Sequence, residues 1–338
     1  MSFNDVFINN KTGLLRSGWR VAIFICCFFF LVDFTYFSIY NIITFGNQYK
    51  IDVITGSFIM GIISIVVAVP LSIWMVRSFD KMTATSLAFH FRKVNLKNIF
   101  VCFFISLLIS SIIIITLTAT KIISFISNPG IPHNNIYFYS MISLMLIYVI
   151  VDVCGEEFVL RGYLQQTLAR GVGLFPSILI TALIFVLLKN LYMKTIYPIE
   201  CVNLFLMSVA FSLSMFKSAS IWVPCGLHIG WDLLQTLAGL KGFDDYHISS
   251  IFYSINDNPG LFYDKIKGID GSVSGIIGWL IIITIIYFLP LGKPLSEHWW
   301  QFSDNIHSAK MRIWDFCINN RDYFQWKIAG QEDTEDEE

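Results

Sequence analysis

Charged side chains are scarce in this sequence: Asp, Glu, Lys and Arg make up 14% of its 338 residues, against 55% hydrophobic residues. Soluble domains carry about 25% charged residues, and a single soluble core stops growing at a few hundred residues. A lipid bilayer can cover this much apolar surface, so we expect a membrane protein. The net charge of -1 leaves too little positive charge to follow a phosphate backbone, which argues against a nucleic-acid partner.

Two further features are missing. The seven cysteines contain no CxxC pair and lie mostly inside apolar runs, which argues against a disulfide framework. The first apolar run begins near Trp19, is too long for the core of a signal peptide, and is followed by no small-residue cleavage site. We therefore expect this run to be a first membrane span rather than a cleaved signal.

The sequence contains several long apolar stretches. A helix of about 20 apolar residues is long enough to cross the hydrocarbon layer of a bilayer. Eight stretches qualify: 19–43, 53–76, 98–120, 136–158, 174–193, 196–216, 219–240 and 272–291. The expected fold class is all-α, a polytopic membrane bundle of about eight transmembrane helices. Lys and Arg gather before the first span, between the second and third spans and in the C-terminal tail. The positive-inside rule then places both termini in the cytoplasm.

These spans predict four parts of the chain. A cytoplasmic N-terminal segment (1–18) precedes the first three spans (19–135), the charged part of the bundle (136–291) and a cytoplasmic tail (292–338). The tail mixes Trp and Phe with charges and ends in acidic residues, which fits an interfacial amphipathic helix or a helix that docks a protein partner. The segment 241–272 is rich in turn formers, so we expect a loop on the outer face.

Ionisable residues inside spans are candidates for function, because each costs about 2.5–3.5 kcal/mol at a helix centre. In the fourth span, Glu157 and Arg161 are four residues apart, in the order that favours a helical ion pair. Glu156 has no such partner, and Asp152 lies one turn before it. A carboxylate in this position can take a proton from water. The alternative is that the whole set is ordinary surface charge at the end of the span.

Two later spans carry further charged residues. Lys189 lies near the end of the fifth span, where a lone lysine usually extends toward the headgroups. His228 and Asp232 are four residues apart in the seventh span, so both project from one face. A histidine in a helix usually packs, but a carboxylate one turn away inside a membrane favours a functional role. A transporter with a proton relay would use the same residues, but paired broken helices and internal symmetry are missing.

The motifs that contain these residues occur in the order of a known motif set. Glu156-Glu157-x-x-x-Arg161, Phe185-x-x-x-Lys189 and His228-x-x-x-Asp232 resemble EExxxR, FxxxH and HxxxN (or Asp) of the CAAX prenyl protease and bacteriocin-processing family. This family, CPBP, is also called Abi or type II CAAX protease, and the resemblance covers about residues 136–290. It implies an eight-helix intramembrane endopeptidase of the bacterial cytoplasmic membrane that hydrolyses a membrane-associated protein, prenylated or not.

The resemblance also implies a role for each residue. Glu156 would activate water, Glu157 and Arg161 would hold the local structure, and His228 and Asp232 would stabilise the tetrahedral oxyanion. Lys189 stands where the family has a histidine. Lysine is not a usual zinc ligand, so we expect no metal and no other cofactor.

The lysine leaves two hypotheses open. An unperturbed lysine is protonated near neutral pH and can only donate a hydrogen bond, so an ion pair with Glu156 would block water activation. The chain is then either an active endopeptidase or a catalytically silent homologue that serves as a regulatory or binding membrane subunit. An ammonium group within about 3 Å of a Glu156 oxygen would favour the silent homologue.

Overall fold

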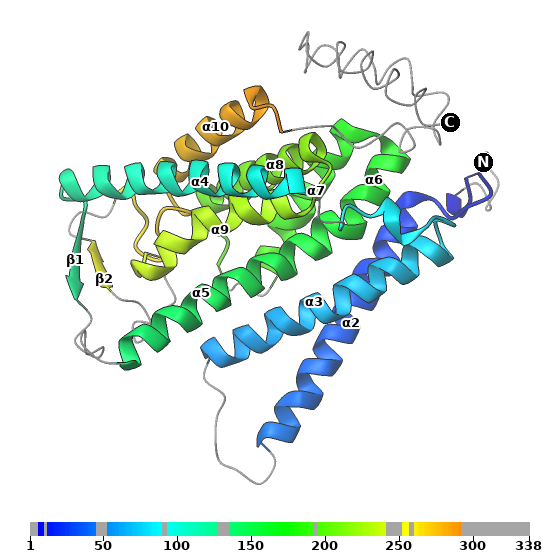
Figure 1. Cartoon of the computed structure of the whole chain (residues 1–338), viewed down its shortest axis with the longest axis horizontal. Coiled ribbons are helices and arrows are strands. Elements are labelled where there is room, and N and C mark those ends of the chain that lie inside the picture. Colours follow the sequence, from blue (N-terminus) through cyan, green and yellow to red (C-terminus); the bar gives the residue numbers. More distant parts are fainter. Residues whose placement is uncertain are drawn as a thin grey trace. The chain divides into compact units, whose positions relative to one another are not determined.

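The computed structural model describes residues 6–9, 12–44, 53–89, 93–127, 136–191, 195–240, 252–256 and 260–291. These residues form an all-α helical bundle (Figure 1), which confirms the predicted fold class. The tail 292–338, with its predicted amphipathic helix, lies outside the described residues.

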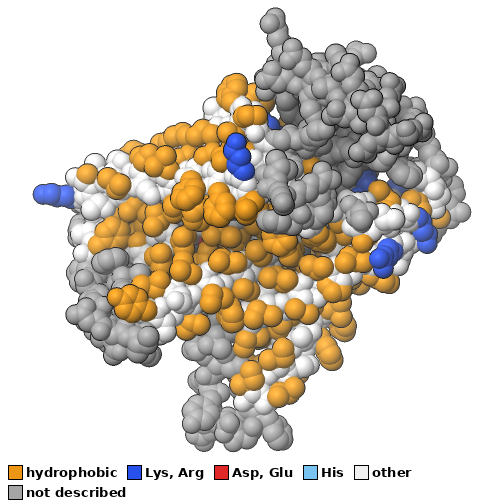
Figure 2. All heavy atoms as spheres, viewed as in Figure 1, with side chains coloured by type: hydrophobic (Ala, Val, Ile, Leu, Met, Phe, Trp, Pro, Cys, Tyr) orange, Lys and Arg blue, Asp and Glu red, His pale blue; other side chains and the backbone are white. Residues whose placement is uncertain are grey.

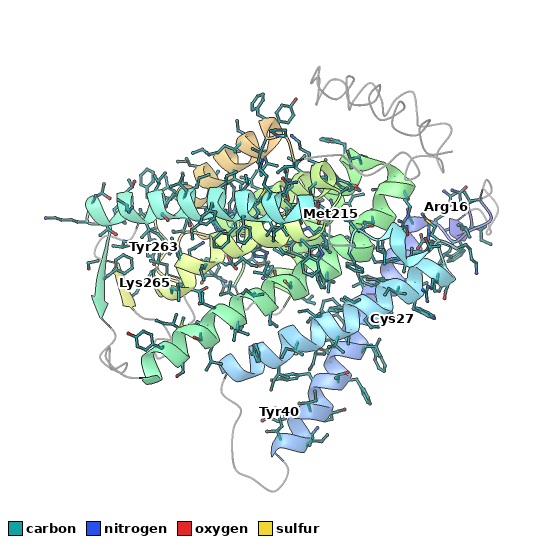
Figure 3. All side chains as sticks on the ribbon, in the orientation of Figure 1. Arg16, Cys27, Tyr40, Met215, Tyr263 and Lys265 are labelled. Carbon is teal, nitrogen blue, oxygen red and sulfur yellow. The ribbon has the colours of Figure 1, made fainter. Side chains whose placement is uncertain are left out.

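Within the described residues, a long helix lies at each of the eight predicted positions. They are α2 Ser17–Thr44, α3 Val53–Ser78, α4 Lys93–Ala119, α5 Ile136–Glu157, α7 Leu174–Asn190, α8 Pro198–Ser218, α9 Trp222–Leu237 and α10 Val273–Phe288. Short elements complete the order: η1 Ala84–Ser86, the π-helical turn η2 Phe158–Leu164 and α6 Gln165–Val172. Side chains fill the space between these helices (Figure 3), and Met215 of α8 is fully buried.

Four described segments are long and apolar enough to cross a membrane: Ser17–Ile43, Phe58–Ser78, Asn95–Ala119 and Pro198–Ser218. α7 and α10 are apolar but shorter. Large apolar side chains also cover the visible surface (Figure 2), and Phe30 and Phe34 of α2 are both more than 60% exposed. An apolar exterior of this extent suits contact with lipid rather than water. That all eight helices span the membrane stays a prediction.

Two short strands correct the expectation of plain loops. β1 (Ile123–Ser127) pairs antiparallel with β2 (Phe252–Asn256), with Ile123 opposite Asn256. Both segments are rich in β-branched and aromatic residues, which favour strands. Each is only five residues long, and the two lie far apart in the sequence, so neither one alone predicts the pairing. The strands join the connection after α4 to the segment before α10.

α3 and α5 approach each other closely at two glycines. A Cβ atom on Gly155 would lie 3.3 Å from the carbonyl oxygen of Gly61, and one on Gly61 would lie 2.9 Å from a methyl carbon of Val151. Small residues of this kind allow membrane helices to pack backbone against backbone. Because Gly155 directly precedes Glu156, the contact places α3 beside that carboxylate.

A buried cluster of three charged side chains connects α2, the end of α3 and α6. Asp80, which follows α3 and is 3% exposed, forms ion pairs with Arg20 of α2 and with Arg170 of α6. The Arg170 Nη2 atom lies 3.4 Å from the shared Asp80 oxygen. The cluster fastens α2 and the end of α3 to the helix that continues from the π-helical turn.

Candidate active site

The fourth predicted span supplies three of the candidate residues from one continuous helical segment. Glu156 and Glu157 are the last residues of α5, and Arg161 lies in the π-helical turn η2 that follows. Adjacent helical residues point about 100° apart. Accordingly the Glu157 side chain is fully buried, whereas that of Glu156 is 24% exposed. The two carboxylates therefore face different surroundings.

Arg161 holds the buried carboxylate. Its Nη1 atom lies 3.3 Å from Oε1 of Glu157, and its Nη2 atom donates to the carbonyl and hydroxyl oxygens of Ser208 at 3.2 and 2.6 Å. The guanidinium also lies over the rings of Phe185 and Phe211, 5.5 and 5.3 Å from their centroids. A fully buried guanidinium needs this combination of ion pair, hydrogen bonds and aromatic faces. It links η2 to α7 and α8.

His228 joins α9 to the same carboxylate. Its Nδ1 atom lies 3.0 Å from Oε1 of Glu157, and its Nε2 atom lies 3.5 Å from Oδ2 of Asp232. The imidazole stacks on the Phe211 ring with the two ring centroids 4.5 Å apart. With a carboxylate against each ring nitrogen, the imidazole is held in one orientation. Glu157, Arg161, His228 and Asp232 thus form one buried network.

Glu156 has a different partner. The Lys189 ammonium on α7 forms an ion pair with Oε1 of Glu156. The ammonium also lies 5.6 Å from the centroid of the Phe185 ring. The second oxygen of Glu156, Oε2, is buried and has no hydrogen-bond partner among the described residues. A lysine cation therefore lies against the candidate carboxylate, at the position where the resemblance implies a histidine.

A cavity of about 210 Å³ opens at this ion pair. Asp152, Glu156 and Lys189 line it, as do apolar side chains of α2 and α3, whereas neither His228 nor Asp232 does. The candidate residues therefore form two groups. The buried network contains Glu157, Arg161, His228 and Asp232, and the ion pair of Glu156 with Lys189 faces the cavity. The oxyanion role implied for His228 and Asp232 stays a prediction.

The first two helices contribute cavity walls that the sequence alone does not predict. Phe28 and Phe29 of α2 and Met60 and Ser64 of α3 line the cavity. Apolar side chains in an apolar span carry no signal of their own. The closely spaced small residues of α3 were the one available sign of a close helix contact. Among the described residues, no group of three or more His, Cys, Asp or Glu side chains is arranged to hold a metal ion.

The part of the chain that holds this site is similar to a known protein family. Residues 138–234 match the family model described as type II CAAX prenyl endopeptidase, Rce1-like. The match runs from α5 into α9 and includes all six candidate residues. No curated protein matches the chain significantly. Together with the four long apolar helices, the match identifies an integral membrane protein. Over residues 138–234, which hold all six candidate residues, this chain is similar to the Rce1-like type II CAAX prenyl endopeptidase family.

Proposed function

We propose that this protein binds a membrane-associated polypeptide in the cavity at Glu156, and that Lys189 prevents the site from hydrolysing it. One observation carries the proposal: the Lys189 ammonium forms an ion pair with Glu156. An ammonium that donates to a carboxylate stabilises the anion and competes with water for it. An ammonium also has no acceptor site, so it cannot take the proton that a neutral histidine can.

The cavity and the family support a polypeptide partner. The family is one of proteases, which act on polypeptides, and its membrane setting favours a membrane-associated one. Most of the side chains that line the cavity are apolar, and two carboxylates and one ammonium lie among them. Ligand sites commonly combine an apolar lining with a few polar groups that fix orientation. About 210 Å³ suits a side chain or a short peptide segment of the bound chain.

A second candidate function is the active endopeptidase, and a different observation favours it. Oε2 of Glu156 is without a hydrogen-bond partner among the described residues, and its side chain lines the cavity. In this candidate, Oε2 takes the proton from a water molecule that attacks the peptide carbonyl. Lys189 then stabilises the oxyanion that develops, because a fixed cation in a site of low polarity is effective there.

The membrane arrangement belongs to the same proposal. The Lys and Arg distribution supports a multi-pass protein with both termini in the cytoplasm, and the family resemblance implies a bacterial cytoplasmic membrane. A reporter fused after Glu338 should read as cytoplasmic, and an external reading would contradict the even number of spans. The aromatic tail 292–338 would lie on the lipid surface or bind a protein partner at that face.

Cleavage and binding assays on the full chain in lipid nanodiscs separate the two candidates. Prenylated and unmodified membrane peptides, each with a photoreactive group, would be offered to the native chain and to Lys189→His, Glu156→Gln and the double variant. We expect the native chain to cross-link peptide without cleaving it, Lys189→His to cleave, and Glu156→Gln to abolish that gain. Lys97→His, at an exposed lysine of α4, is the matched control. Native cleavage that Glu156→Gln abolishes would instead establish the endopeptidase.

A further inference from the structure

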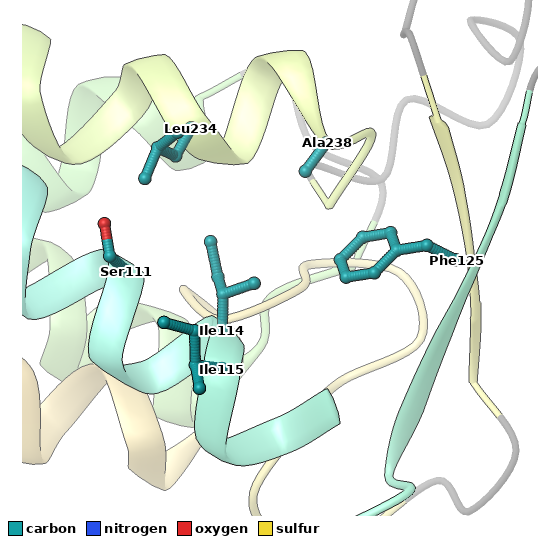
Figure 4. A pocket seen from close by; sticks show the side chains of 6 residues that line it. All are labelled: Ser111, Ile114, Ile115, Phe125, Leu234 and Ala238. Atoms are coloured by element: carbon teal, nitrogen blue, oxygen red, sulfur yellow. The ribbon is translucent and has the colours of Figure 1, made fainter. Parts of the chain in front are cut away.

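A second cavity, of about 340 Å³, lies between α4, α9 and β1. Figure 4 shows six side chains around it: Ser111, Ile114 and Ile115 of α4, Phe125 of β1, and Leu234 and Ala238 at the end of α9. It shares no lining residue with the cavity at Glu156. None of these six residues belongs to the candidate active site, so this cavity needs its own explanation.

The lining of this cavity is unfavourable for water. Its surface is wholly apolar, and the hydroxyl of Ser111 donates to the carbonyl oxygen of Leu107 at 2.6 Å. A water molecule needs two to four polar partners, and apolar cavities of about 150 Å³ stay dry and bind small hydrocarbons. A site more than twice as large, whose accessible surface is apolar, therefore fits a hydrocarbon chain.

The position of the cavity indicates where such a chain comes from. Ile115 lines the cavity and is also 66% exposed, so the wall of the cavity continues into the outer apolar face of α4. The apolar span of α4 ends at Ala119, and Ser111 therefore lies roughly 12 Å along the helix from that end. The bilayer that surrounds this face consists of acyl chains. A chain that enters between α4 and α9 would leave its headgroup near the end of α4.

A positive charge stands at that end. Lys121 is exposed and follows α4 by two residues, between the helix and the strand that carries Phe125. Lysines beside a membrane surface attract anionic lipid headgroups. We propose that this cavity binds an acyl chain of an anionic phospholipid, with the headgroup phosphate at Lys121. The site is independent of the proposed function at Glu156.

The lipid would contact the helix of the buried network. Leu234 lies two residues after Asp232 on α9, and Ala238 directly follows the last residue of that helix. An acyl chain in the cavity would fill the space between the ends of α4 and α9 and support their packing. A lipid bound at this site would therefore contact α9, the helix that carries His228.

Photolabelling tests the site in the full chain. The protein would be placed in nanodiscs with phosphatidylglycerol or phosphatidylcholine that carries a diazirine in its acyl chain, and labelled peptides would be mapped by mass spectrometry. We expect label on the segments with Ile114, Phe125 and Leu234. Ser111→Leu should lower this label about tenfold, because the added side chain displaces about two methylenes of the bound chain. Ser143→Leu, at an exposed serine that also donates to its own helix, is the matched control.

The headgroup has its own test. Lys121→Gln should lower labelling by phosphatidylglycerol several-fold and leave phosphatidylcholine labelling unchanged. Lys81→Gln is the control, because Lys81 is also exposed and has the same backbone φ of 56°. If either control variant lowers labelling as much as its partner, the proposal is wrong.

Other results would overturn the proposal. Label that is insensitive to Ser111→Leu, and no denser than on other lipid-facing helices, would mean ordinary contact with surrounding lipid. Displacement by a free isoprenoid alcohol, with no effect of Lys121→Gln, would mean an isoprenoid site. If Ser111→Leu does not fold, as judged by size-exclusion chromatography, Ala238→Leu fills the same cavity and has the same expected result.

Discussion

Replacing Arg161 by methionine removes the cation of the buried network while keeping a long side chain in its place. The arginine is fully buried, and it bonds to Glu157 and to two oxygens of Ser208. Without it, His228 is the partner that the carboxylate of Glu157 keeps among the described residues, and the Ser208 oxygens lose a charged donor. Breaking a buried ion pair from one side costs about 3–5 kcal/mol. We expect the free energy of unfolding to fall by about that amount.

Unfolding in detergent micelles, followed by steric trapping or by thermal aggregation, measures this loss. Arg77→Met is the matched control, since Arg77 is exposed at the end of α3, and it should change stability by less than about 0.5 kcal/mol. Adding Glu157→Gln to Arg161→Met should recover part of the loss, with a coupling of about 0.5–3 kcal/mol. Equal stabilities of Arg161→Met and Arg77→Met, or strictly additive effects in the double variant, would mean that Arg161 does not stabilise the buried carboxylate of Glu157.

Two other changes test the packing around the site. Gly155→Leu forces a side chain into the backbone contact with α3, so it should destabilise the fold by about 1–3 kcal/mol or more. Gly260→Leu has open space around its Cβ position and should have little effect on the same unfolding curve. Asp80→Asn leaves two buried guanidinium groups, those of Arg20 and Arg170, without their carboxylate and should cost about 3–5 kcal/mol. An unchanged midpoint for Asp80→Asn would mean that this cluster does not fasten α2 to the bundle.

The helices were predictable because the bilayer imposes a simple length rule. Each of the eight apolar runs contains a helix, and these helices begin and end within a few residues of the bounds expected. The π-helical turn at Phe158 was not predictable, since an extra residue in one turn leaves no mark on hydropathy. The pairing of β1 with β2 was also missed, because it depends on contact between segments about 130 residues apart.

The site was predictable where it is local. Glu157 with Arg161, and His228 with Asp232, are one helical turn apart, and both pairs are in contact in the structure. Contacts between helices have no such spacing rule. The Ser208 partner of Arg161 lies 47 residues away on another helix. The order of the three motifs predicted that these residues share one site. It did not predict that Glu157, rather than Glu156, contacts His228.

The ion pair between Lys189 and Glu156 decides whether the site can hydrolyse a peptide bond, and a rate comparison shows which is the case. The rate of peptide-bond hydrolysis would be compared, in the same nanodiscs and with the same membrane peptide, between the native chain and Lys189→His. We expect no measurable hydrolysis by the native chain, and hydrolysis by Lys189→His that a further Glu156→Gln removes. Hydrolysis by the native chain that is lost in Glu156→Gln would contradict this expectation.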